Sequence, residues 1–189
     1  MPQADGGPGH LFLVVGPSGA GKDSLIEGAR RALADLPQFT FPRRIITRRS
    51  DPGSEDHATL SEAEFDAQRA AGAFFLHWDA HDLRYALPGS IADALAGGGT
   101  VVANVSRKVI AEACRRHPMT TVVFVTAPPE VLERRLLARG REDAAAVTRR
   151  LDRSAALPDG AEVVTVVNDG PLESAVERFV AVLRSSADA

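Results

Sequence analysis

A short apolar run that stops at a glycine-rich turn constrains the fold more than any other feature of the chain. Residues Leu11–Leu25 read LFLVVGPSGAGKDSL, in which Leu11–Val15 predicts a buried strand and the residues from Lys22 onward a helix. The glycines between them let the backbone curl until successive N–H groups point inward at phosphate oxygens, and the start of the helix adds its positive end. The stretch therefore predicts a strand, a phosphate-binding loop and a helix.

The loop lysine makes this motif specific. Lys22 completes the spacing G-x-x-x-x-G-K, from which its side chain can reach the β- and γ-phosphates of a nucleotide. Among the 22 lysines and arginines of the chain only Lys22 and Lys108 are lysines, so a lysine at this position by chance is improbable. The residues predicted to bind the nucleotide here are Gly16, Pro17, Ser18, Gly19, Ala20, Gly21, Lys22, Asp23 and Ser24.

Asp23 departs from the usual pattern. The residue after the loop lysine is normally Ser or Thr, whose hydroxyl binds Mg²⁺, whereas this chain has Asp23 followed by Ser24. A carboxylate can bind Mg²⁺ directly, which makes Asp23 a candidate metal ligand. The helix dipole also favours an acidic residue at a helix N-terminus, and this alternative stays open.

Composition excludes several other classes of protein. A length of 189 residues with 44% hydrophobic residues fits one globular domain, and a net charge of −3 provides no basic field for nucleic acid. No apolar run approaches the roughly 18 residues of a membrane span, and the N-terminus lacks the features of a signal peptide. We therefore expect a frayed tail over residues 1–9 and a cytoplasmic protein without a membrane segment. The single cysteine excludes a disulfide framework, and His57, His77 and His81 match no metal-ligand spacing.

The rest of the chain alternates strands and helices. Valine-rich runs at Thr100–Val105, Thr121–Thr126 and Glu162–Val167 predict strands buried on both faces, as in a parallel sheet. Right-handed crossovers through helices then give an α/β fold of the P-loop type, with helices on both faces of the sheet. The expected helices are Lys22–Leu36, Pro88–Ala96, Ser106–Arg116, Pro129–Arg139, Ala144–Ala156 and Leu172–Ser185.

One segment interrupts this alternation. Phe39–Leu87 combines short strands and polar turns with one small helix, which the capping box of Ser61 and Glu64 begins. We expect an inserted acceptor-binding subdomain over the carboxyl ends of the strands, where ligands bind in such folds. The single domain then has a core over about 11–38, 88–138 and 154–185, an insertion over about 39–87 and a lid over about 139–153.

Two groups of arginines accompany the loop. A helical run of arginines is often a solvated face, but guanidinium groups beside a phosphate loop match the charge of a transferring phosphoryl group. A phosphate acceptor is already anionic, so it needs charge shielding and alignment more than a general base. Lys22, Arg139 and Arg150 are the predicted catalytic residues. The first group is Arg134, Arg135, Arg139, Arg141, Arg149, Arg150 and Arg153, and the second is Arg43, Arg44, Arg48 and Arg49.

Several motifs resemble the guanylate kinase family: GPSGAGK at Gly16–Lys22, ITR at Ile46–Arg48, RRLLARGRED at Arg134–Asp143 and VVNDG at Val166–Gly170. The acceptor half departs from that family. Its second acceptor arginine falls at Asp51, its phosphate-contacting tyrosine at His57, its guanine-reading glutamate near Leu76, and its D-I-D sequence at Asn104–Ser106. Leucine cannot accept hydrogen bonds from a guanine edge, so the base pocket is expected to be lost while the donor half is kept.

Four linked motifs are instead similar to the ribose 1,5-bisphosphate phosphokinases of phosphonate utilisation, relatives of the guanylate kinases. They are GKDS at Gly21–Ser24, ITR at Ile46–Arg48, the segment Gly53–Phe65, and VANVSR at Val102–Arg107. This resemblance implies ATP and Mg²⁺ as cofactors, a phosphorylated sugar as acceptor, and a monomer or homodimer. It also implies that Asn168 lies at the nucleotide. The implied substrate-binding residues are Arg48, His57, Tyr85, Asn104, Ser106 and Arg107.

Two alternatives remain open at this level. The first is a guanylate kinase or another nucleoside monophosphate kinase with an altered acceptor pocket. The second is an inactive guanylate-kinase-like interaction domain, which the retained Lys22 and the lid arginines disfavour. Trp78 and Tyr85 fit a pocket and a hydrophobic core equally well.

Overall fold

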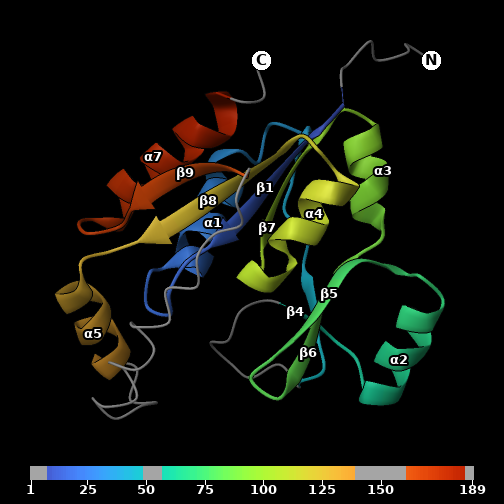
Figure 1. Cartoon of the computed structure of the whole chain (residues 1–189). Coiled ribbons are helices and arrows are strands. Elements are labelled where there is room, and N and C mark those ends of the chain that lie inside the picture. Colours follow the sequence, from blue (N-terminus) through green and yellow to red (C-terminus); the bar gives the residue numbers. More distant parts are fainter. Residues whose placement is uncertain (1–7, 49–56, 139–160, 186–189) are drawn as a thin grey trace.

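The computed structural model describes residues 8–48, 57–138 and 161–185. A parallel five-stranded sheet forms the centre of the molecule, with the strand order β2-β7-β1-β8-β9 (Figure 1). The central β1 is apolar from Leu11 to Val15, and these buried side chains contribute to both faces of the sheet. The strands are β1 His10–Val15, β2 Phe39–Thr40, β7 Thr100–Asn104, β8 Thr120–Thr126 and β9 Glu162–Val167.

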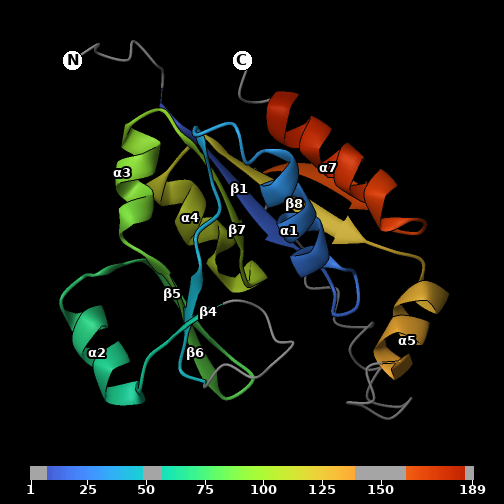
Figure 2. The same cartoon turned by 180° about the vertical axis from the view of Figure 1, so that it is seen from behind.

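Helices cover both faces of this sheet. α1 (Lys22–Ala32) and α7 (Leu172–Ser185) lie together on one face, where Figure 2 shows them in front of the strands. α3 (Ser90–Ala96) and α4 (Ile110–Arg116) lie on the opposite face, towards the viewer in Figure 1. Among the described helices none is long and apolar enough to cross a membrane.

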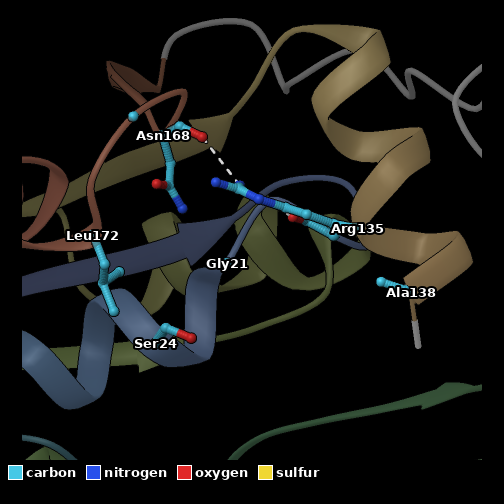
Figure 3. Close-up of a pocket in the computed structure, with 8 residues that line it drawn as sticks. Gly21, Ser24, Arg135, Ala138, Asn168 and Leu172 are labelled. Carbon is cyan, nitrogen blue, oxygen red and sulfur yellow. Dashed lines mark hydrogen bonds between the residues drawn. The ribbon is translucent and has the colours of Figure 1, made fainter.

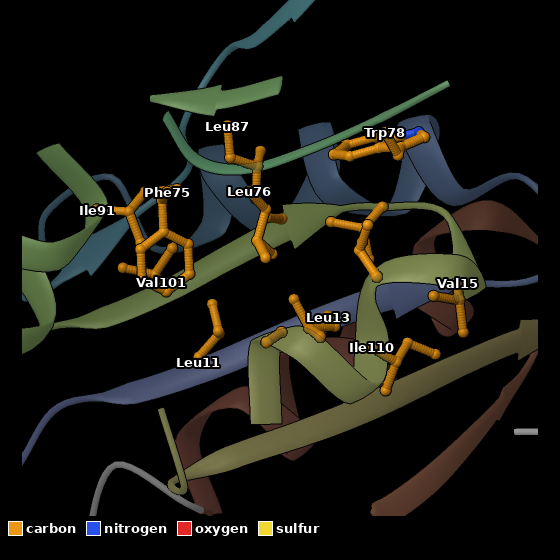
Figure 4. Close-up of a cluster of buried hydrophobic side chains, with 14 of the residues drawn as sticks. Leu11, Leu13, Val15, Phe75, Leu76, Trp78, Leu87, Ile91, Val101 and Ile110 are labelled. Atoms are coloured by element: carbon orange, nitrogen blue, oxygen red, sulfur yellow. The ribbon is translucent and has the colours of Figure 1, made fainter. Parts of the chain in front are cut away.

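A second sheet of four strands, in the order β4-β3-β6-β5, forms beside the first. Its strands are β3 Arg44–Ile46, β4 His57–Thr59, β5 Phe74–Ala80 and β6 Leu83–Pro88, and α2 spans Glu62–Ala70. The capping box predicted for Ser61 and Glu64 is confirmed at the start of α2. Figure 4 shows Leu76 of this sheet directed towards Leu13 of β1, within one hydrophobic cluster. The second sheet is thus held against the core by burial of apolar surface.

Several boundaries differ from the expected ones. α1 ends at Ala32 instead of Leu36, because the chain tightens into turns at Leu33 and Pro37 disfavours helix in the residue before it. The expected insertion begins with two separate strands, β2 and β3, since Pro42 between them has no N–H to donate to a ladder. β2 pairs with β7, so Phe39 and Thr40 belong to the five-stranded sheet.

The helix expected over Ser106–Arg116 also starts differently. A 3₁₀ turn, η1 (Arg107–Val109), precedes α4, and the Ser106 hydroxyl caps that turn by accepting a hydrogen bond from the N–H of Lys108. α5 (Pro129–Ala138) follows β8 with proline at its first position, where the missing N–H costs nothing. The predicted β9 and α7 have the boundaries expected from the sequence.

Candidate nucleotide and acceptor site

The glycine loop joins the carboxyl end of β1 to the first turn of α1. Gly21 is the N-cap of α1 with φ +87°, a left-handed conformation that favours glycine. A Cβ built on Gly21 would collide with Nδ2 of Asn168. Gly16 is similarly restricted, because its Cβ would collide with the carbonyl oxygen of Val125. The glycines are therefore required by the conformation of the loop and by its close packing against β8 and the end of β9.

Lys22 lies over this loop. Its Nζ donates hydrogen bonds to the carbonyl oxygens of Gly16 at 2.9 Å and Pro17 at 3.0 Å. These bonds hold the ammonium group at the mouth of the loop, where the N-terminus of α1 also concentrates positive potential. The geometry suits a point charge that exchanges backbone carbonyl oxygens for phosphate oxygens.

Next to the loop is a pocket of about 390 Å³, large enough for a nucleotide base and sugar. Figure 3 shows Arg135 and Asn168 meeting across its wall, with Arg135 donating to the Asn168 carbonyl oxygen. The lining residues are Gly19, Gly21, Ser24, Arg135, Ala138, Asn168, Gly170 and Leu172.

Asn168 follows β9 and ties the loop to the sheet edge. It is 3% exposed, its N–H donates to the Thr126 carbonyl oxygen at 2.7 Å, and its Nδ2 donates to the Ala20 carbonyl oxygen at 2.8 Å. Its Oδ1 is shielded from solvent and has no hydrogen-bond partner among the residues that the structure describes. An acceptor atom of this kind at a pocket wall is suited to a donor group on a ligand.

Arg135 is a site residue that the sequence analysis named only within a group of seven arginines. Its guanidinium donates to the carbonyl oxygens of Asn168 at 3.0 Å and Gly19 at 3.4 Å, so it connects α5 with the loop. A sequence signal was available, because Arg135 and Arg139 are four residues apart in the expected helix Pro129–Arg139, a spacing that predicts one shared face. Arg139 and Arg150, the predicted lid residues, lie outside the described residues.

Asp23 and Asn104 meet between the loop and the sheet. Asp23 is exposed in the first turn of α1, and its Oδ1 accepts a hydrogen bond of 2.6 Å from Nδ2 of Asn104 at the end of β7. Asp23 and Ser24 offer only oxygen donors, as Mg²⁺ prefers. The described residues hold no group of three or more His, Cys, Asp or Glu side chains that could bind a metal alone. This donor set fits a cation that takes most of its ligands from substrate phosphates and water.

The face of the second sheet turned towards the core carries an arginine on an aromatic pair. Tyr85 and Trp78 are opposite each other on β6 and β5, and their rings stack at 5.6 Å. The guanidinium of Arg44 lies 5.6 Å from the centre of the Tyr85 ring. Both aromatic residues belong to the hydrophobic core, and Tyr85 also supports a cation.

Two other predicted acceptor residues lie at the edge of this sheet. His57 is 2% exposed, and its Nε2 is 3.0 Å from the Arg48 carbonyl oxygen, which also accepts a hydrogen bond from Thr59. The histidine therefore anchors the backbone from which the Arg48 side chain extends. Leu76, near which the resemblance to guanylate kinases puts the guanine-reading glutamate, is 1% exposed in the core.

Arg107 extends from η1 over the carboxyl end of the central sheet. Its guanidinium lies 5.2 Å from the Phe124 ring centre on β8, and burial lowers its pKa from the usual value. Ser106, beside it, caps η1. Burial removes water from the guanidinium and so disfavours its charged form. A bound phosphate would offset that cost, so Arg107 is suited to bind an anion.

Comparison with known proteins places this architecture in a family. No protein-family model matches the chain. The chain is 46% identical over 179 residues to ribose 1,5-bisphosphate phosphokinase PhnN of Brucella melitensis, covering 94% of this chain and 93% of that protein. It is 51% identical over 182 residues to the bifunctional ribose 1,5-bisphosphokinase-thymidine phosphorylase of Cupriavidus pinatubonensis, spanning 96% of this chain but 30% of that longer protein.

A solved structure supports the fold independently. The guanylate kinase of Anaplasma phagocytophilum matches with a TM-score of 0.69 and 17% identity, covering 97% of this chain and 89% of that chain. The resemblance in fold thus extends over the loop, the parallel sheet and the second sheet together. The chain therefore belongs to the family of the ribose 1,5-bisphosphate phosphokinases, P-loop kinases with the guanylate kinase fold.

Proposed function

We propose that this protein transfers the γ-phosphoryl group of ATP to the 1-phosphate of ribose 1,5-bisphosphate, giving 5-phosphoribosyl 1-diphosphate and ADP. The observation that carries the proposal is the contrast between the two halves of the site. The donor half keeps the glycine loop with Lys22, whereas the acceptor half has Leu76 buried where a base-reading carboxylate would be needed. Arginines supply its polar groups, which suits an acceptor with phosphates and no base.

The transfer needs little acid–base chemistry. An oxygen of the acceptor 1-phosphate attacks the γ-phosphorus, and the bond from that phosphorus to the oxygen bridging it to the β-phosphorus breaks, leaving ADP. The attacking oxygen is already anionic, so alignment and charge stabilisation are sufficient. Lys22 and the loop N–H groups would hold the β- and γ-phosphates, and Arg107 and Arg48 would hold the acceptor phosphates.

Asp23 and Ser24 would hold Mg²⁺ together with the phosphates, and the ion would neutralise charge on the transferring group. The pocket beside Asn168 and Arg135 would receive the adenosine part of ATP. The proposed lid arginines, Arg139 and Arg150, would complete the charge stabilisation from the segment after α5.

A direct acceptor assay tests this function. The purified protein is incubated with ATP and Mg²⁺ and with either ribose 1,5-bisphosphate or GMP, and products are followed by ³¹P NMR. We expect a new diphosphate signal with the sugar and no GDP with GMP. Lys22→Ala should reduce the rate by about 100-fold or more, because a charged contact to the transferring group is lost. Turnover of GMP alone would show a nucleoside monophosphate kinase instead.

A further inference from the structure

Arg44 is held in a defined position on the core-facing side of the second sheet. Arg44 and Ile46 are two residues apart on β3 and therefore share a face, and Ile46 pairs with Tyr85 and is buried in the core. The guanidinium rests over the Tyr85 ring, which in turn stacks on Trp78 with an interplanar angle of 6°. This aromatic support limits the rotamers of a long side chain and places its charge between the two sheets.

The charges around Arg44 come from both halves of the site. Burial lowers the pKa of Arg44, the charge of Asp23 and the Tyr85 side chain oppose that shift, and Arg48 adds to it. The negative charge of Asp23, in the first turn of α1, and the positive charge of Arg48 therefore both act on the Arg44 guanidinium. A phosphate group bound between the Arg44 and Arg48 guanidinium groups would offset their mutual repulsion.

The side chain of Arg48, two residues beyond β3, contains a buried hydrogen-bond donor. Its Nε is shielded from solvent and has no hydrogen-bond acceptor among the described residues. Its backbone is fixed, since the carbonyl oxygen is bound by His57 and Thr59, each at 3.0 Å. A buried donor of this type calls for an acceptor, and a phosphate offers several oxygens to a pair of guanidinium groups.

We propose that Arg44 is a specificity-determining residue of the acceptor site, which binds one phosphate group of a sugar bisphosphate together with Arg48. This inference rests on the proposed function and gives a specific role to Arg44, which the sequence analysis named only as one of a group of four arginines.

The test measures acceptor binding directly, without ATP or Mg²⁺. Titration calorimetry with ribose 1,5-bisphosphate is performed on the wild-type protein, Arg44→Gln and Arg44→Lys, and binding of a non-hydrolysable ATP analogue is measured separately. Arg30→Gln is the matched control, because Arg30 also lies over an aromatic ring, that of Phe41 at 5.9 Å, but near the far end of α1. Thermal melts establish that each variant is folded.

We expect Arg44→Gln to weaken acceptor binding by about 10-fold or more, in line with the loss of a charge-assisted hydrogen bond. Arg44→Lys should retain part of the affinity, because lysine keeps the charge but loses the planar fork. The affinity for the ATP analogue should change less than about twofold, and Arg30→Gln should behave as wild type. If Arg44→Gln is unfolded, the Arg44→Lys comparison alone decides, with unchanged acceptor affinity overturning the proposal.

The possible failures are distinguishable. Acceptor binding by Arg44→Gln at wild-type affinity, or an equal loss for acceptor and ATP analogue, would overturn the role of Arg44 and leave the proposed function intact. A wild-type protein that neither binds nor phosphorylates ribose 1,5-bisphosphate would overturn the proposed function, and the role of Arg44 with it.

Discussion

Nδ2 of Asn104 donates a hydrogen bond of 2.6 Å to Oδ1 of Asp23. This bond joins the carboxyl end of β7 to the first turn of α1, and so links a predicted acceptor residue to the predicted metal ligand. It orients the Asp23 carboxylate from the side of the acceptor. The residue that departs from the usual loop pattern is therefore part of a contact between the two halves of the site.

Replacing Asp23 tests whether its carboxylate binds Mg²⁺. Asp23→Ser exchanges a charged oxygen ligand for a neutral hydroxyl, so we expect the Mg²⁺ concentration for half-maximal activity to rise by roughly 3- to 10-fold. Calorimetric binding of ADP with and without Mg²⁺ should show the same shift. Asn104→Ala keeps the carboxylate and loses only its orientation, so its shift should be smaller. An unchanged Mg²⁺ requirement in Asp23→Ser would leave only the helix-dipole explanation.

Removal of the Arg107 guanidinium tests its assignment to an acceptor phosphate. Arg107→Ala should raise the KM for the acceptor by about 10-fold or more, because a charge-assisted hydrogen bond is lost, while the KM for ATP changes little. Steady-state kinetics with each substrate varied in turn measures both constants. Lys108→Ala is the control, since the neighbouring Lys108 is exposed. Equal effects on both KM values would contradict the assignment.

Gly21 should tolerate no side chain. Gly21→Ala requires a Cβ at φ +87° and in the space of the Asn168 amide, so both backbone strain and collision oppose it. Gly72→Ala is the matched control, because Gly72 has φ +68° with nothing within 4 Å of a Cβ. Urea unfolding should show a loss of about 1–2 kcal/mol for Gly72→Ala and a larger loss for Gly21→Ala. ATP-analogue affinity should fall only in Gly21→Ala.

His10 should make stability depend on pH. Burial lowers the pKa of His10 from 6.5, an effect that the charge of Glu162 opposes and His117 reinforces. Its Nε2 is 2.9 Å from the Thr121 hydroxyl, which donates to Glu162. The unfolded chain therefore binds a proton more readily than the folded one, so stability is full above the unfolded pKa and falls as the pH drops through 6.5 towards the folded pKa.

Urea unfolding between about pH 5.5 and 8 measures this dependence. His10→Gln should flatten the loss of stability on the acidic side, because the titrating group is gone. His77→Gln should follow the wild-type curve, since His77 is exposed on β5. Parallel curves for wild type and His10→Gln would show that other groups control the acidic transition.

Local sequence patterns predicted the central elements well. The boundaries of β9 and α7 agree with Glu162–Val167 and Leu172–Ser185, because periodic apolar residues and turn residues mark both elements. The same patterns overextended α1, since an apolar periodicity continues into a turn where the backbone has already left the helix. They also assigned Phe39 and Thr40 to the insertion, whereas β2 pairs with β7 in the five-stranded sheet.

The sequence by itself determined the donor chemistry: a glycine loop, Lys22 and an unusual Asp23 lie within a few consecutive residues, and short-range spacing is what a sequence displays directly. Only the tertiary structure decided which distant groups meet them. Asp23 and Asn104 are 81 residues apart, and they meet because strand order brings β7 beside β1. Arg44 reaches Tyr85, 41 positions along the chain, because β3 pairs with β6 and places Ile46 opposite Tyr85. Such contacts depend on strand order and strand pairing, which local spacing does not reveal.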